Sequence, residues 1–194
     1  MLFSESLPDT NGAPNAVAHV PDAERCVTTE LRAVGNVLVQ VGRTGEHFAG
    51  SHLDLLSGAH RTPSAAAGTA PQFDPAAPAR YRAVHQAMRR GLVQSCHDIA
   101  EGGLAVAVAE MCIASRLGVT IDALPHADAT AAMFSETAGR LVLEVAPDDL
   151  GTVKAMVPDT VVLGTVSTDP VLDFAGLARV DVARLTEAFA GEPL

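Results

Sequence analysis

The segment that most constrains the fold is residues 103–118, which read GLAVAVAEMCIASRLG. Its only charged side chains are Glu110 and Arg116, so a helix built from it is apolar around nearly its whole circumference. Such a helix has to be buried on more than one side. The residues just before it, 95–102, read SCHDIAEG and are mostly polar. The chain therefore passes from a polar cluster directly into a core helix.

Strands and further helices are expected on both sides of this segment. Short β-branched apolar runs predict strands, and apolar residues at helical spacing predict helices. The helix expected over 79–92 places Tyr81, Val84, Met88 and Leu92 on one face. Strands are expected at 36–42, 93–98, 119–124, 140–146 and 160–167, and the other helices at 147–157 and 181–190. Strands alternating with helices predict a layered α/β or α+β sandwich.

Length and composition indicate one soluble domain. The chain has 194 residues, 48% of them hydrophobic, yet its apolar runs fall far short of the ~18 residues that span a bilayer. We expect residues 20–194 to form the domain, residues 1–19 to be a poorly structured lead-in, and residues 59–78 to form a surface loop. The N-terminus lacks signal-peptide features and the three cysteines lack paired spacing, so we expect a cytoplasmic protein.

The net charge excludes one class of partner. The chain carries 23 acidic and 13 basic residues, a formal charge of −10. Nucleic-acid binding needs a clustered basic face to neutralise phosphates, so we expect no nucleic-acid partner.

Two polar stretches hold the candidate site residues. The first stretch is residues 97–103, HDIAEGG. Its functional hypothesis is that carboxylates and helix-start amides hold a phosphate, a metal-bound nucleotide or an amide-bearing substrate. The structural alternative is that Asp98 caps a turn, the glycines allow close backbone approach, and His97 is a core or contact residue. In the second, FSETAGR, the alternatives are ligand binding or a plain turn in which Arg140 neutralises Glu136. The candidates are His97, Asp98, Glu101, Gly102, Gly103, Ser135, Glu136 and Arg140.

The remaining polar residues give weaker indications. The glycine-rich loop at 43–58 matches neither a Walker loop nor GxGxxG, although its His47, Ser51 and His52 are placed where they could contact a ligand. The seven histidines lack metal-ligand spacing, so no metal site is expected. Cys96 and His97 are neighbours in a strand and point to opposite faces, so they form no dyad. No residue is assigned a catalytic role.

Three stretches, in order and at matching distances, resemble the synthetase subunit of phosphoribosylformylglycinamidine synthase. Residues 97–111, HDIAEGGLAVAVAEM, resemble the family pattern H-D-[VI]-S-[DE]-G-G-L-A-V-A-[LV]-A-E-M. Residues 134–140, FSETAGR, resemble the turn F-S-E-S-x-x-R, and residues 42–53, GRTGEHFAGSHL, resemble the loop G-x-T-x-x-x-L-G-G-S-E-Y. We refer to these as the helix motif, the turn motif and the loop motif. The chain departs from the family at Ala49, His52 and Ala100, where glycine, glutamate and serine are usual.

The resemblance implies a fold and a reaction. It implies an α+β fold, an α/β/α three-layer sandwich with a mixed sheet and partly ferredoxin-like character, which is the last C-terminal domain of a much longer enzyme. The complete enzyme would convert formylglycinamide ribonucleotide to formylglycinamidine ribonucleotide in purine biosynthesis. ATP would activate the amide oxygen as a phosphate ester, and ammonia from glutamine would displace it.

The resemblance also implies cofactors and partners. ATP and magnesium would belong to the complete enzyme and lie mainly on N-terminal domains, so this chain would bind neither fully and would have no turnover alone. The implied partners are the ATP-binding portion of the synthase, a glutaminase subunit and a small accessory subunit, with a homodimer as a further option. The alternatives are a non-catalytic binding or scaffold module, or a domain of another superfamily enzyme such as selenophosphate synthetase.

Overall fold

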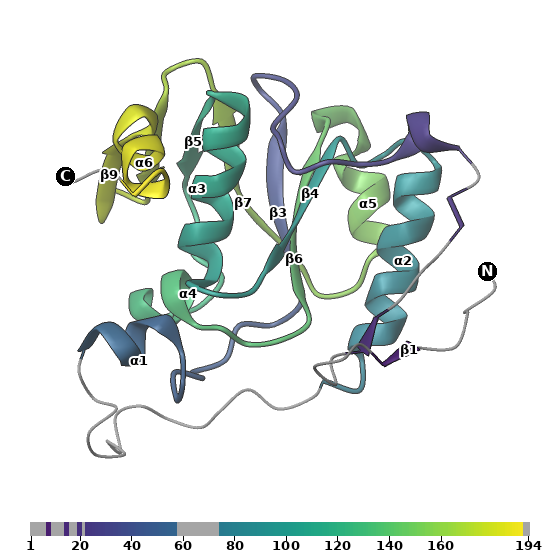
Figure 1. The fold of residues 1–194 in the computed structure, drawn as a ribbon. Helices are drawn as coiled ribbons and strands as arrows, with labels where there is room; N and C mark the ends of the chain where they lie inside the picture. Colours follow the sequence, from purple (N-terminus) through teal and green to yellow (C-terminus); the bar gives the residue numbers. More distant parts are fainter. Residues whose placement is uncertain (1–6, 9–13, 16–18, 21, 58–73, 192–194) are drawn as a thin grey trace.

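The structure is a computed structural model that describes residues 7–8, 14–15, 19–20, 22–57 and 74–191 (Figure 1). Most of the expected lead-in at 1–19 and of the expected loop at 59–78 lies outside these residues. The strands are β1 (Leu7–Pro8), β2 (Pro14–Asn15), β3 (Val37–Val41), β4 (Ser95–Ile99), β5 (Gly118–Ile121), β6 (Arg140–Val145), β7 (Thr160–Ser167), β8 (Val171–Phe174) and β9 (Ala178–Asp181). The helices are η1 (Ala23–Arg25), α1 (His52–Ser57), α2 (Ala77–Arg89), α3 (Gly103–Ser115), α4 (Ala129–Phe134), η4 (Pro147–Asp149), α5 (Leu150–Met156) and α6 (Val182–Phe189).

The described strands β3 to β9 form one mixed sheet. Its order is β4-β6-β3-β7-β5-β8-β9. Neighbouring strands are antiparallel, except that β5 and β8 are parallel. β1 and β2 form a separate two-stranded ladder.

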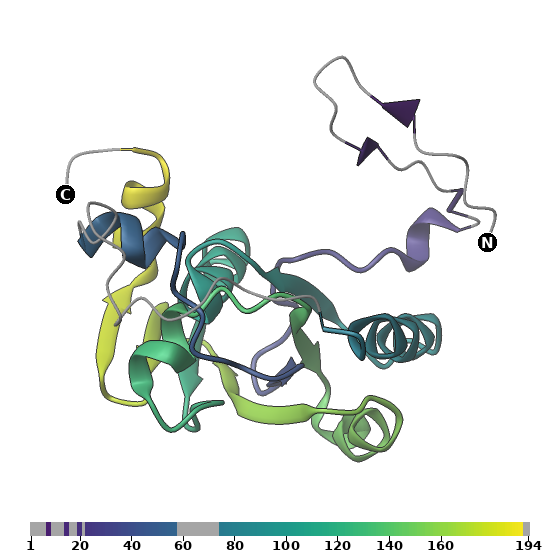
Figure 2. The same cartoon turned by 90° about the horizontal axis from the view of Figure 1, so that it is seen from below.

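Helices cover both faces of this sheet, which gives three layers (Figures 1 and 2). One apolar cluster joins α3 to the face that carries Leu38 and Val142. The other joins α2 and α5 to the face that carries Val39 and Leu143. Because adjacent residues of β3 and β6 point to opposite faces, both strands are buried on both sides. The expected α+β three-layer sandwich with a mixed sheet is confirmed.

The structure differs from the sequence-based expectation in several elements. α2 begins at Ala77, and the face it buries includes Arg80, Val84 and Ala87, whereas Tyr81 is 46% exposed. The short elements α1, α4, β8 and β9 were not expected, because four to six residues are too few to show a period. Within the described residues, no helix combines the length and apolar character that crossing a bilayer would need.

Candidate functional site

The three motifs meet at one end of the sheet. The ladder between β4 and β6 pairs Ile99 with Arg140, and the ladder between β3 and β6 pairs Val41 with Leu141. β3 and β4 therefore end where β6 begins, at the lower end of the sheet in Figure 1. The helix motif follows β4, the loop motif follows β3, and the turn motif precedes β6. Antiparallel pairing thus brings together stretches that lie far apart in the sequence.

The paired glycines of the helix motif are required by packing. Gly102 and Gly103 have φ of 74° and 70°, a left-handed conformation that glycine adopts without strain. A Cβ on Gly103 would lie 2.7 Å from the carbonyl oxygen of Met133 and 2.8 Å from Cα of Phe134. The start of α3 therefore touches the backbone at the end of α4. This contact explains the glycines without a ligand.

Glu136 of the turn motif connects the other two motifs. Its Oε1 accepts hydrogen bonds from the backbone N–H of Gly102 at 2.8 Å and of His52 at 2.9 Å. The same oxygen lies 3.3 Å from Nδ1 of the His52 ring. Among the described residues, the second oxygen of this carboxylate, Oε2, has no hydrogen-bond partner. Glu136 thus links the start of α3 to the loop motif through one oxygen.

Arg140 does not neutralise Glu136. Its side chain is 1% exposed, and its guanidinium donates to the backbone oxygens of Ser135 and Thr137 and to Oγ1 of Thr44 at 3.1 Å. Burial lowers the pKa of Arg140 to about 10, which leaves it charged at neutral pH. Ser135 is also buried, and its hydroxyl lies 2.8 Å from that of Thr137. Both residues therefore hold the turn motif against the loop motif.

His97 connects β4 to α3 beside a small cavity. Its Nδ1 donates to the backbone oxygen of Asp98 at 2.7 Å, and its Nε2 lies 2.9 Å from Oε2 of Glu110. Both ring nitrogens therefore face acceptors. The side chains of Asp98 and Glu101 are 72% and 83% exposed. These residues line a cavity of about 300 Å³ with Ala100 and Ala107.

The surface around this cavity is acidic. Asp98, Glu101 and Glu110 line it, and Glu136 bonds to the backbone N–H of the neighbouring Gly102. A bare phosphate would be repelled by these carboxylates. A ligand that presents N–H groups or a bound cation would be attracted.

The cysteines and histidines form no reactive or metal-binding group in the described part of the chain. Burial, reinforced by Asp98, raises the pKa of the Cys96 thiol to about 12, and burial raises the pKa of Cys112 to about 12. Both are therefore neutral thiols at physiological pH, which disfavours a nucleophilic role. No group of three or more His, Cys, Asp or Glu side chains that could hold a metal ion occurs among the described residues.

Two buried charged residues were missed by sequence reasoning. Glu144, fully buried in β6, accepts hydrogen bonds from the backbone N–H groups of Arg32 and Ala33 and from two side chains. Its position inside the apolar run RLVLEVA was a signal that could have identified it. Arg80, 2% exposed, forms ion pairs with Asp74 and with Asp159 at 3.2 Å. No sequence pattern marked it.

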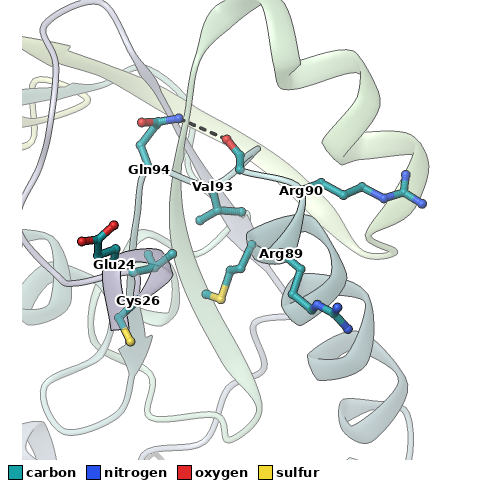
Figure 3. A pocket seen from close by; sticks show the side chains of 9 residues that line it. Glu24, Cys26, Arg89, Arg90, Val93 and Gln94 are labelled. Carbon is teal, nitrogen blue, oxygen red and sulfur yellow. Dashed lines mark hydrogen bonds between the residues drawn. The ribbon is translucent and has the colours of Figure 1, made fainter. Parts of the chain in front are cut away.

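The cavity drawn in Figure 3 lies away from the motifs. It has a volume of about 410 Å³ and lies where α2 ends and β4 begins. Arg89 and Arg90 lie at its edge with Glu24 and Cys26, and the Gln94 side chain donates to the Gly91 oxygen (Figure 3). None of the eight candidate residues lines it.

Comparisons with known proteins identify the fold and the relatives. The family model for the C-terminal domain of AIR synthase related proteins matches residues 33–174. The phosphoribosylformylglycinamidine synthase subunits PurL of Brucella ovis and Brucella canis are each 39% identical over 168 residues, which is 81% of this chain and 21% of theirs. The chain thus spans about a fifth of the length of these relatives.

Solved structures share the fold at low identity. PurL of T. maritima complexed with FGAR has a TM-score of 0.71 at 19% identity, covering 84% of this chain and 30% of that one. E. coli HypE has a TM-score of 0.57 at 17% identity, and the match covers 80% of this chain and 51% of HypE. The family model spans most of the described domain, including the end of the sheet where the three motifs meet. The chain belongs to the family of AIR synthase related protein C-terminal domains.

Proposed function

We propose that the chain is the C-terminal domain of a phosphoribosylformylglycinamidine synthase and acts with a companion chain that supplies the rest of the enzyme. The observation that carries this proposal is the 39% identity to PurL over 168 residues. The complete enzyme would convert formylglycinamide ribonucleotide to formylglycinamidine ribonucleotide in the cytoplasm. ATP would activate the amide oxygen, and ammonia released from glutamine would replace it.

The chain's share in this reaction is to complete the wall of a site. Asp98 and Glu101 are the exposed carboxylates of this wall, and the Glu136 side chain is 16% exposed. Carboxylates accept hydrogen bonds from N–H groups, which suits an amide-bearing or amidine-bearing substrate. The other candidate residues support the site without facing a ligand, because their polar groups bond within the chain or their positions are fixed by packing. They are His97, Gly102, Gly103, Ser135 and Arg140.

ATP and magnesium are assigned to the companion chain. The described residues contain no metal-binding group of three or more side chains. The Gly102 N–H, which would otherwise face a phosphate at the start of α3, already donates to Glu136. The described residues therefore do not fit a complete ATP–magnesium site, and we assign no catalytic step to them.

A non-catalytic scaffold module is the second candidate. It is favoured by the way Glu136, Arg140 and His97 bond to groups of the chain itself. In that case the motifs would maintain the fold and an interface without contacting substrate. A glutaminase subunit and a small accessory subunit are partners of the first candidate only.

Reconstitution distinguishes the two candidates. The full chain is co-expressed with a PurL-like companion encoded in the same genome, and amidine formation is measured with substrate, ATP and ammonia. We expect a stable complex with ammonia-dependent activity and no turnover by the chain alone. Turnover by the chain alone would refute the need for a companion. A complex whose activity is unchanged by Asp98→Asn, Glu101→Gln and Glu136→Gln together would favour the scaffold module.

A further inference from the structure

The outer face of α3 is apolar and incompletely covered. Its inner side chains are fully buried in the core, whereas Ala105, Ala109 and Ile113 are only partly buried and Val106 is 39% exposed. Glu110 is the only charged residue on this outer face, and its carboxylate contacts His97. A helix that is apolar all round is normally buried all round. The outer face of α3 is therefore suited to a contact that the described residues do not make.

A groove continues this apolar face toward the end of the chain. It has a volume of about 360 Å³ and lies between α3, the end of α4, β8, β9 and α6. Phe134, Leu172, Val180 and Leu185 contribute to its walls. Phe189 also lines it and is 69% exposed. We call this surface, together with Val106, Ala109 and Ile113, the α3 groove.

The α3 groove adjoins the candidate site. Glu110 lines both the groove and the acidic cavity that contains His97 and Asp98. A single partner lying across α3 would therefore bury Val106 and at the same time close the acidic cavity. The surface next to the groove carries Asp98, Glu101 and Glu110, so a complementary partner presents apolar side chains flanked by basic ones.

We infer that the α3 groove is the docking surface for the companion chain, which inserts an apolar segment with basic flanks. This inference rests on the proposed function and adds to it the place of contact. The chain spans only 21% of the length of its PurL relatives, so most of the residues found in those relatives lie outside this sequence. The groove offers the companion chain an apolar surface that adjoins the acidic cavity of the helix motif.

The test compares charged substitutions inside and outside the groove. Val106→Asp and Ile113→Asp each introduce a carboxylate into the groove, and Val34→Asp introduces one at an equally accessible valine, 49% exposed, in the segment before β3. Affinity for the full-length companion chain is measured by titration calorimetry, and circular dichroism checks that each variant is folded. We expect at least tenfold weaker binding for the two groove variants and less than a twofold change for Val34→Asp.

Other outcomes separate the two proposals. If the groove variants bind as tightly as the natural chain, the groove assignment is wrong while the proposed function stands. If the natural chain forms no complex, both are wrong. A homodimer that Val106→Asp dissociates would replace the companion with a second copy. If the groove variants unfold, a Val106→Cys substitution in a Cys26→Ser background replaces them. Alkylation of the new thiol at position 106 should slow at least tenfold in the complex, and an unchanged rate would refute the assignment of the groove as the docking surface.

Discussion

The buried carboxylate of Glu144 should contribute strongly to stability. Its Oε2 accepts from the Arg32 N–H and the Ser95 hydroxyl, each at 2.8 Å. Its Oε1 accepts from the Ala33 N–H at 3.0 Å and from the Asn36 side-chain amide at 2.7 Å. These bonds attach the segment before β3 to β6, the second strand of the sheet order. The substitution Glu144→Gln keeps the size of the side chain and removes its charge.

The expected loss follows from these contacts. In the glutamine variant the amide NH₂ replaces one acceptor oxygen. If it replaces Oε2, it faces the Arg32 N–H, donor against donor, and that N–H keeps only its longer hydrogen bond to Oε1, at 3.1 Å, while Ser95 can rotate to accept. The shorter hydrogen bond from Arg32 is then lost and the others lose their charge assistance. Hydrogen bonds to charged groups contribute roughly 1.5–3 kcal/mol each, so we expect a loss of about 2–4 kcal/mol in the free energy of unfolding.

Urea unfolding followed by circular dichroism measures this loss. For a domain of this size about 3 kcal/mol corresponds to a decrease in Tm on the order of 10 °C. Glu30→Gln is the matched control, since Glu30 lies in the same segment and its carboxylate pairs with Arg32 at the surface. A change smaller than about 0.5 kcal/mol for Glu144→Gln would refute the reasoning, because that is the size expected of an ordinary surface substitution.

Four further predictions concern the glycines, Glu136 and the thiols. Gly103→Ala should destabilise the domain by about 2–4 kcal/mol, because the new Cβ would lie 2.7 Å from the Met133 oxygen at a φ of 70°. Gly151→Ala, in α5 with open space around it, should stabilise it by about 0.5–1 kcal/mol, and equal effects in urea unfolding would contradict this account. Glu136→Ala should speed hydrogen exchange at the Gly102 and His52 amides while Glu136→Gln preserves protection, and unchanged exchange in both would show that these bonds do not form. Cys26 is exposed and should react with a thiol reagent in the native state, whereas Cys96 and Cys112 should react only after unfolding. Because the pKa of both buried thiols is raised, their contribution to the free energy of unfolding is fully present below the unfolded thiol pKa of about 8.5 and decreases as pH rises toward 12. Urea unfolding midpoints that do not decrease between about pH 8 and about pH 11 would contradict this.

Long elements with a clear apolar pattern could be predicted from the sequence. The strand expected at 160–167 coincides with β7, and the apolar run at 103–118 contains α3. β8 and β9 were missed because strands of four residues carry little pattern. Pairing of β5 with β8 depends on contacts between distant segments, which local patterns do not encode.

The sequence motifs named residues that the fold brings together, but they did not indicate which contacts those residues make. The turn motif contains Glu136 and Arg140, and the ion pair between them that was one of its two alternatives is absent among the described residues. Arg140 is buried beneath the turn, where backbone oxygens surround it, while Glu136 points to the N–H groups of Gly102 and His52. These orientations depend on three-dimensional packing, as does the position of Glu144 against the segment before β3.

The central claim is that this chain completes a PurL-type synthase. The most direct measurement is a titration in which a fixed amount of the companion chain, with substrate, ATP and ammonia, receives increasing amounts of this chain while amidine formation is recorded. We predict that activity rises from a negligible level and saturates at one chain per companion. Full activity of the companion without this chain, or no activity at any ratio, would contradict the claim.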